Sequence, residues 1–337
     1  MFRAIGEPAT PGAPELGAKA LAVEASAPGK LVLSGEYAVL AGAPALVAAV
    51  DRRVTCTLVP RDGGGWRFVS TGFETEQTLT RDEVFQAPAD SVAGVVRRVI
   101  VEDRAPGHIE VRIDSTPCHL DGAKLGVGSS AALVAAVAAA FSVVGGDAPG
   151  LATLVDIHKS FQGGGSGLDV AAAITGGVIR FQDQRIVPSR LPDVHRAFIF
   201  VGTSTRTADL VARFDAWRGA ASPPALERLI EAAVEVADCT LTADVFLDAL
   251  SEYTDVLERM DRMARIGIFG PGHQAAREIA GRCGVVYKPC GAGGGDTGVG
   301  FAANRDAVAR FVKKAGESGL TIVPMEVSDD GIRIRTE

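Results

Sequence analysis

The stretch from Lys124 to Ala140, KLGVGSSAALVAAVAAA, joins a glycine-serine turn directly to a long alanine-rich helix. Gly126 and Gly128 allow backbone conformations and close approaches that a Cβ would prevent. Ser129 or Ser130 is a favoured N-cap, and the first N–H groups of a helix have no partner inside it. Together with the helix dipole, these donors favour an anion such as a phosphate at the turn. The alternative is an ordinary capped helix that follows a glycine turn.

The helix after this turn is expected to lie in a hydrophobic core. Its apolar run, Ala131 to Val144, is too short and too rich in alanine to cross a bilayer. A hydrophobic content of 47% argues against disorder. The chain has 337 residues, which is enough for roughly two domains, each with its own core.

Charge and cysteine content narrow the class of protein. A formal net charge of -7 gives no general attraction to nucleic acid or to anionic membranes, so an anionic ligand needs local positive groups. The five cysteines form no CxxC pair, which suits a reducing cytoplasm and no structural zinc. The N-terminus lacks the pattern of a signal peptide, and residues 1–20 are expected to form a flexible leader.

Hydrophobic periodicity predicts an α+β protein of two domains, residues 21–190 and 191–337, divided where the composition becomes polar and proline-rich. Helices are expected near 90–103, 129–144, 151–161, 224–238, 242–264, 273–283 and 305–316, and another from 208. Strands are expected near 22–40, with a break at Pro28-Gly29, and near 45–59, 66–70, 108–114, 197–201, 285–287, 299–302, 320–325 and 332–335. The last two strands would complete the second domain.

Two further glycine-rich stretches strengthen the case for an anion site. Gly163 to Gly167 leads into Asp169 at the first turn of a helix, where an aspartate either compensates the helix dipole or faces a reacting hydroxyl or a cation. The loop from Gly291 to Asp296 lies between two expected strands. Lys30 can project from a strand start toward a phosphate, or it is a solvated surface lysine. Glu36 follows near a helix start, and its role stays open.

Two common nucleotide motifs are excluded. The string GVGSSA from Gly126 matches the dinucleotide fingerprint, but a polar segment precedes it, and Asp147 ends a helix instead of a second strand. A Walker A loop is missing, because no glycine stands at the required spacing before Gly29-Lys30. Strands and helices also alternate too irregularly for a doubly wound sheet.

Three separated motifs resemble those of one known family. APGKLVLSGEYAVL, KLGVGSSAAL and KPCGAGGGDTG are similar, in order and spacing, to the motifs of the galactokinase, homoserine kinase, mevalonate kinase and phosphomevalonate kinase (GHMP) superfamily. The resemblance spans the chain from Ala25 to its C-terminus. It implies an N-terminal α+β domain and a C-terminal ferredoxin-like α+β domain, with ATP and a small acceptor in the cleft between them.

Within the superfamily, the details are most similar to the phosphomevalonate kinases. Asp296 follows the third glycine run where mevalonate kinases usually have another glycine, and QGGGSGLDVAAA differs from their HGNPSGxD string. His158 stands where mevalonate kinases place a magnesium-binding glutamate, and the glycine run at Gly163 lacks a lysine of the subgroup. A mevalonate kinase or another small-alcohol kinase of the superfamily is the nearest alternative. A related decarboxylase and a catalytically silent nucleotide-binding protein of this fold are more distant ones, and a nicotinamide oxidoreductase fits poorly.

The resemblance also implies two cofactors, ATP and Mg²⁺, and a role for each motif. Lys30 would lie near the transferred phosphoryl group, and Asp169 near the acceptor oxygen, either as a base or as a group that positions Lys30 or the metal. Ser130, or alternatively Ser129, would contact Mg²⁺. The residues that would bind ATP are Lys124, Gly126, Gly128, Ser129, Ser130 and Ala131.

The acceptor implied by the resemblance is phosphomevalonate, or else mevalonate, in the synthesis of isoprenoid precursors. Lys288 and Arg206 would neutralise its charge, although Arg206 could equally be a surface arginine. The protein is expected to be a cytoplasmic monomer or homodimer that binds neither nucleic acid nor membrane. The residues that would bind the acceptor are Ser166, Gly167, Arg206, Lys288, Gly291, Gly293, Gly294, Gly295 and Asp296.

Overall fold

Helix α3 (Ser129–Val143) forms the centre of the first domain, and every residue from Ala131 to Phe141 is buried. The computed structural model describes residues 22–72, 75–145, 148–202, 207–220, 224–239 and 242–336, so the expected leader lies outside the described residues. The helix packs against strands β1 (Val23–Ser34) and β2 (Ala45–Pro60). An apolar surface on all sides is typical of a helix enclosed by protein, as the sequence predicted.

The first sheet has eight strands, in the order β14-β1-β2-β5-β3-β4, with β8 paired to β2 and β9 to β8. Neighbouring strands run antiparallel except for β3 and β5, which are parallel. The expected break at Pro28-Gly29 is a shift of register within the continuous strand β1. The remaining strands of the sheet are β3 (Trp66–Thr71), β4 (Thr75–Leu79), β5 (Ile109–Asp114), β8 (Val178–Gln182), β9 (Arg185–Ser189) and β14 (Arg333–Thr336).

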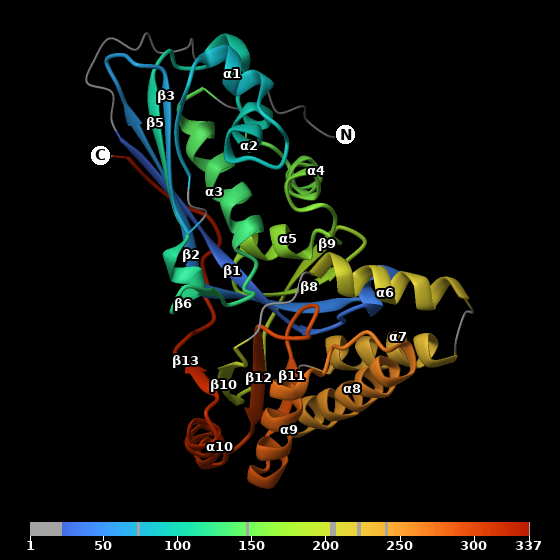
Figure 1. The fold of residues 1–337 in the computed structure, drawn as a ribbon. Coiled ribbons are helices and arrows are strands. Elements are labelled where there is room, and N and C mark those ends of the chain that lie inside the picture. The colour runs from blue at the N-terminus through green and yellow to red at the C-terminus, as the bar shows by residue number, and fades with distance from the viewer. Residues whose placement is uncertain are drawn as a thin grey trace, which may run out of the picture.

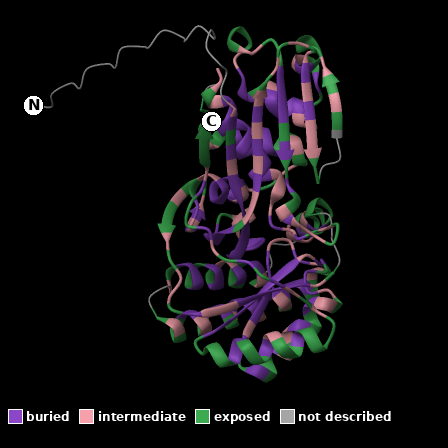
Figure 2. Ribbon diagram, turned by 90° about the vertical axis from the view of Figure 1, so that its left-hand side faces the viewer, coloured by how far each residue is buried: buried purple, intermediate pink, exposed green. Residues whose placement is uncertain are grey.

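Helices cover one face of this sheet around α3 (Figure 1). A short hairpin of β6 (His119–Leu120) and β7 (Ala123–Lys124) leads into the turn before α3. Figure 2 shows the buried residues running through the strands of both sheets, with exposed residues on the outer sides of the helices. The covering helices are α1 (Arg81–Gln86), α2 (Val92–Val99), α4 (Leu151–Gln162) and α5 (Leu168–Thr175).

The second sheet confirms the expected ferredoxin-like unit. Its order is β11-β12-β10-β13, which together with two helices gives the βαββαβ connectivity of that fold. Ala197 and Ile199 face the two helices, whereas Phe198 and Phe200 face the opposite side, as strand alternation requires. The elements are β10 (His195–Phe200), α9 (Pro271–Cys283), β11 (Val286–Pro289), β12 (Thr297–Ala302), α10 (Arg305–Glu317) and β13 (Thr321–Val323).

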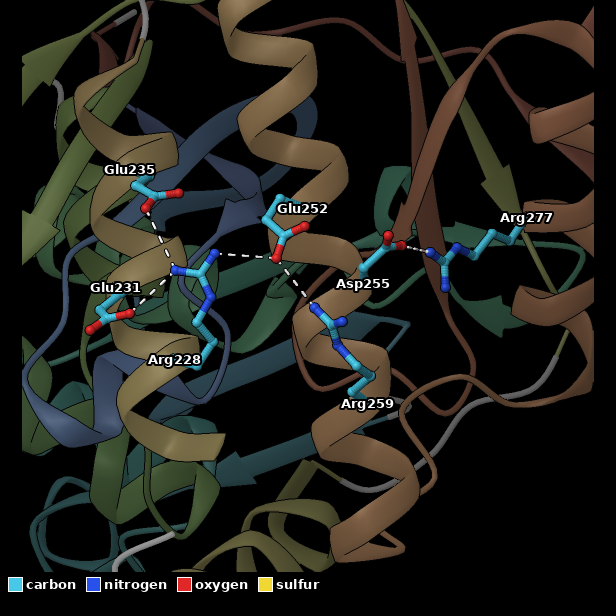
Figure 3. A network of polar contacts seen from close by, with 7 residues as sticks. All are labelled: Arg228, Glu231, Glu235, Glu252, Asp255, Arg259 and Arg277. Carbon is cyan, nitrogen blue, oxygen red and sulfur yellow. Dashed lines mark hydrogen bonds and ion pairs between the residues drawn. The ribbon is translucent and has the colours of Figure 1, made fainter. Parts of the chain in front are cut away.

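Three helices are inserted between β10 and α9, namely α6 (Thr207–Ala220), α7 (Pro224–Asp238) and α8 (Ala243–Ala264). Ion pairs join α7 to α8 and α8 to α9 (Figure 3). Arg228 of α7 lies 3.2 Å from Glu252 of α8, and Arg277 of α9 pairs with Asp255 of α8. This network links α7, α8 and α9 at the surface. In the described part of the chain, no helix is both long and apolar enough to cross a membrane.

The C-terminal strand departs from the expected domain organisation. Residues 332–335 were expected to complete the second domain, but β14 pairs with β1 in the first sheet, with Thr336 opposite Val23. The chain therefore leaves the second sheet after β13 and returns along the first domain (Figure 1). The physical reason is that β1 has a free edge beside β2 that the last strand covers, and an alternating sequence does not specify which edge it will pair with.

Candidate active site

Lys30 and Asp169 form an ion pair at the junction of the two domains. The Lys30 Nζ lies 3.6 Å from Asp169 Oδ1, and the side chains are 9% and 22% exposed. Lys30 is held on β1, where its N–H donates to the Val127 carbonyl at 2.7 Å. Asp169 is the second residue of α5, which begins after Gly167. A lysine this buried is not a solvated surface residue, and an acid in the first turn also suits the dipole of α5.

The three motifs APGKLVLSGEYAVL, KLGVGSSAAL and KPCGAGGGDTG, here the three glycine motifs, meet around this pair. A Cβ at Gly29 would lie 2.6 Å from the Val127 carbonyl oxygen, and one at Gly128 would lie 3.0 Å from Lys30 Cε. A Cβ at Gly126 would lie 2.4 Å from the Cβ of Asp296 in the third motif. The separations at Gly29 and Gly126 are shorter than real Cβ contacts, and the one at Gly128 is tight at a φ of 74°, so all three positions favour glycine.

A pocket opens between the motifs, and residues from six segments line its wall. The segments are the first motif from Lys30 to Leu40, the turn before α3, α4, the loop into α5, α6 and the third glycine loop. The predicted site residues at the wall are Lys30, Gly126, Ser166, Gly167, Asp169, Gly291 and Asp296. The structure thus brings together, at one pocket, seven of the seventeen residues that the sequence singled out.

The start of α3 differs from the expected capping. Gly128, with φ 74°, is the N-cap, and neither serine caps the helix. The Ser130 hydroxyl instead lies 3.0 Å from His158 Nε2 and donates to Gln162 Oε1, both on α4. Burial lowers the pKa of His158, so its imidazole is neutral at neutral pH. Ser130 is therefore fixed by α4 at the beginning of the helix.

These residues fit a nucleotide phosphate and one metal ion brought with it. Gly126 and Gly128, with φ of 73° and 74°, form the turn before α3, and the positive end of this helix would attract phosphate oxygens. Among the described residues, no group of three or more His, Cys, Asp or Glu side chains could hold a metal. Mg²⁺ is commonly held by few protein ligands plus phosphates. In this protein, the Ser130 hydroxyl and the Asp169 carboxylate are the groups that would coordinate the metal ion.

The third glycine loop is supported from behind by α9 and by the segment that precedes it. His273 accepts from Tyr287 Oη at 2.9 Å through Nδ1 and donates from Nε2 to the Gly295 carbonyl at 2.7 Å. The Gly294 N–H donates to the Ile268 carbonyl at 2.7 Å. Asp261 in turn accepts from three successive N–H groups, those of Gly267, Ile268 and Phe269. Gly293 to Gly295 therefore shape the loop rather than line the pocket.

Lys288 lies behind the pocket wall. Its side chain is fully buried, and its ammonium pairs with Glu36 and donates to the carbonyls of Val32 and Pro289. Tyr253 of α8 donates to the other Glu36 oxygen at 2.8 Å, and burial together with Glu36 raises the pKa of this tyrosine. The charge of Lys288 is thus compensated by Glu36, which sequence reasoning left open. The sequence around Glu36, GEYAVL, contains no pattern that indicates its partner Lys288, 252 residues away.

Tyr37 links the first motif to the third. Tyr37 is the central residue of a γ-turn, in which the Ala38 N–H donates to the Glu36 carbonyl at 2.7 Å. Its φ of 63° and ψ of -43° are strained for a residue with a side chain. The Tyr37 hydroxyl donates to the Ala292 carbonyl at 2.6 Å, and its ring lies 5.1 Å from that of Phe214 on α6. Sequence reasoning missed this residue, because no pattern predicts a positive φ at a tyrosine.

The other expected site residues lie outside the pocket wall. Lys124 is exposed on the β6–β7 hairpin, and Ala131 is buried inside α3. Ser129 is the first residue of α3 and is partly exposed. Arg206 lies outside the described residues. Direct contacts of these four residues with a ligand stay predictions.

Removing the charge of Glu36 should destabilise the protein strongly. Glu36→Gln leaves the ammonium of Lys288 buried without an opposite charge, which we expect to lower the free energy of unfolding by about 3 kcal/mol. The double variant Glu36→Gln with Lys288→Met removes both charges and should recover part of this loss. Urea unfolding measures both values. A double variant as unstable as the sum of the two single variants would contradict the pairing.

His273 should make stability depend on pH. Burial lowers its pKa from 6.5 to about 4, so between these values the unfolded chain binds a proton that the folded protein does not. The free energy of unfolding should therefore fall as the pH is lowered from 6.5 to 4, by about 3 kcal/mol in all. His273→Gln removes this contribution, whereas other groups titrate equally in both proteins. Equal pH dependence of urea unfolding in the variant and the wild type would contradict it.

Comparisons with known proteins agree with this arrangement. A family model described as the GHMP kinases N terminal domain matches residues 91–177. A phosphomevalonate kinase from Streptomyces sp. (strain CL190) is 28% identical, over 91% of this chain and 97% of that protein. A mevalonate kinase from Pyrococcus horikoshii is 27% identical, over 93% of this chain and 97% of that protein.

The fold is shared with a solved structure of Streptococcus pneumoniae phosphomevalonate kinase in complex with phosphomevalonate and AMPPNP. The TM-score is 0.72 at 16% identity, and the match covers 90% of this chain and 99% of that chain. Together with the three motifs gathered at one pocket, these matches show that the chain is a member of the GHMP kinase superfamily of ATP-dependent kinases that act on small metabolites.

Proposed function

We propose that the protein is a phosphomevalonate kinase, which transfers the γ-phosphoryl group of ATP to the phosphate of phosphomevalonate and yields diphosphomevalonate and ADP. The observation that carries the proposal is the convergence of three helix starts on one pocket. Gly126 precedes α3, Gly167 precedes α5, and Thr207 begins α6, and all three line the wall. Helix N-termini attract anions.

This arrangement answers the electrostatic problem of bringing two anions together in an acidic protein. Of the residues described at the pocket wall, Lys30 is the only lysine or arginine. The wall also contains three acidic residues, Glu36, Asp169 and Asp296. Lys288 compensates Glu36 from behind. Helix N-termini supply the further positive potential without lysine side chains. A doubly anionic acceptor is therefore better accommodated than the charge count alone suggests.

The transfer itself needs mainly positioning and charge stabilisation. An acceptor phosphate oxygen attacks the γ-phosphorus, and the bond from that phosphorus to the β–γ bridging oxygen breaks. Lys30 neutralises charge on the transferred group, and the turn from Gly126 to Ser130 holds the remaining phosphates through its N–H groups. Mg²⁺, when bound, would neutralise phosphate charge. A phosphate monoester has a second pKa of about 6 and is mostly dianionic at neutral pH, so Asp169 would orient Lys30 rather than act as a base.

The second candidate is mevalonate kinase, which is the activity named for the relative from Pyrococcus horikoshii. One contact favours it specifically. The partly exposed Asp169 carboxylate lies 3.6 Å from the Lys30 ammonium, and a mevalonate hydroxyl, which is protonated at neutral pH, would gain from such a base. An assay of ADP release with ATP and each of phosphomevalonate, mevalonate, homoserine and a sugar separates the candidates. Turnover of phosphomevalonate alone supports the proposal, and preferred turnover of mevalonate refutes it.

Two substitutions test the assigned roles in the same assay. Lys30→Met removes the charge beside the transferred group and should lower kcat by about 100-fold or more. Asp169→Asn should lower kcat on phosphomevalonate by about 10-fold, whereas loss of a base for a hydroxyl acceptor costs about 100- to 10,000-fold. Melting temperatures of both variants provide the control for folding. Unchanged kcat of Asp169→Asn on the preferred acceptor would remove this residue from the chemistry.

A further inference from the structure

The segment from Pro324 to Gly331, here the C-terminal strap, crosses from the second domain back to the first. It begins after β13 in the second sheet and ends where β14 pairs with β1 (Figure 1). On this path it passes the C-terminal end of α5, the helix whose first turn carries Asp169. No sequence motif marked the strap as part of the active site.

The strap and the end of α5 touch through their backbones. A Cβ at Gly331 would lie 2.2 Å from the Ile174 carbonyl oxygen, and a Cβ at Gly176 would lie 2.3 Å from the Gly331 nitrogen. Both positions must be glycine for the two chains to cross at this distance. The strap is therefore packed directly against the backbone at the end of α5.

Hydrogen bonds join this crossing to the strand that carries Lys30. The Gly177 N–H donates to the Ser328 carbonyl at 2.7 Å, and the Ser328 N–H donates to the Ala49 carbonyl at 2.9 Å. The Ala49 N–H donates to the Gly177 carbonyl at 2.8 Å, and Ala49 is the cross-strand partner of Lys30 in the β1–β2 ladder. One point thus connects the strap, the end of the Asp169 helix and the partner strand of Lys30.

Arg53 fastens the strap at this point. From β2 its guanidinium donates to Ser26 of β1, through both the hydroxyl at 3.0 Å and the carbonyl at 2.8 Å. It also donates to the Ser328 hydroxyl at 3.3 Å and to the carbonyls of Asp330 at 3.2 Å and Gly331 at 2.6 Å. Burial lowers the pKa of Arg53 to about 10, so the group keeps its charge at neutral pH. The planar fork of donors suits several acceptors at once, which a lysine cannot match.

We propose that Arg53 is a positioning residue for phosphoryl transfer, which through the C-terminal strap holds α5 so that Asp169 stays against Lys30. The inference rests on the proposed function, because it needs Lys30 and Asp169 to act in catalysis. It does not depend on which acceptor is used. Arg53 lies on β2 and contacts neither member of the pair among the described interactions, so its effect passes through the strap.

Arg53→Met tests the proposal, since methionine keeps the apolar stem and removes every donor. Because small misplacements of reacting groups slow catalysis, kcat should fall by about 3- to 10-fold, with KM for ATP changed less than about twofold. In the Asp169→Asn background, the same substitution should lower kcat by less than about 1.5-fold, because the group it positions is already lost. Arg335→Met, which removes an exposed arginine of β14, is the matched control and should leave kcat unchanged.

Three further tests, two variants and one exchange measurement, keep the experiment decisive. Ser328→Ala removes one acceptor of Arg53 and should give a smaller loss of kcat, which covers the case in which Arg53→Met fails to fold. Amide hydrogen exchange of the ligand-free protein should be faster at Gly177 in Arg53→Met, but unchanged in Arg335→Met. Arg53→Lys should restore kcat only in part.

The outcomes separate this inference from the proposed function. Equal fold-losses of kcat in the wild-type and Asp169→Asn backgrounds, or unchanged exchange at Gly177 with unchanged kcat, would overturn the positioning role. Faster exchange at Gly177 in a protein that turns over neither phosphomevalonate nor mevalonate would refute the proposed function, while supporting the hold of the strap on α5.

Discussion

The site depends on close approaches that are possible because certain residues carry no Cβ. A Cβ at Gly29 would collide with Val127 and one at Gly126 with Asp296, and one at Gly128 would press on the side chain of Lys30. The approaches at Gly29 and Gly128 lie within the first domain, whereas the approach of Gly126 to Asp296 forms only when both domains are folded and joined. The pocket is therefore a product of the whole tertiary structure. Two of these glycines form the turn before α3, at the helix end where we propose that phosphate binds.

Around these contacts the protein surrounds the Lys30–Asp169 pair with buried polar groups. Glu36 and Lys288 form a buried ion pair between the first motif and β11, and Tyr37 reaches from the same motif to the third loop. His273 holds that loop from behind through the carbonyl of Gly295. Each partner satisfies a group whose burial would otherwise be costly. The result is a site whose walls are fixed from both domains before any ligand arrives, which suits a reaction that depends on positioning.

The sequence predicted many of the elements, because they depend on local signals, but α1, β4, β8 and β9 were not among the expected ones. Helices α7 and α9 and the strands beside the third glycine loop appear close to their expected ranges, and hydrophobic periodicity together with glycine turns was sufficient for them. The convergence of three motifs came from their resemblance to a family. Pairing between residues far apart in the sequence could not be predicted from such local signals. Glu36 with Lys288, and β14 with β1, are joined by contacts between distant positions that leave no local pattern. The predicted serine N-cap of α3 was wrong for a different reason. Gly128 is the N-cap, and the Ser130 hydroxyl instead contacts His158 on α4.

The central claim is that the three glycine motifs form one nucleotide-phosphate site. Calorimetric titration of wild type and Gly126→Ala with a non-hydrolysable ATP analogue tests it most directly, because a Cβ there would lie 2.4 Å from Asp296 and the position has φ 73°. The account predicts at least a tenfold (about 1.4 kcal/mol) weaker affinity in a variant that remains folded. Equal affinity in the folded variant, or no binding of the analogue by the wild type, would contradict it.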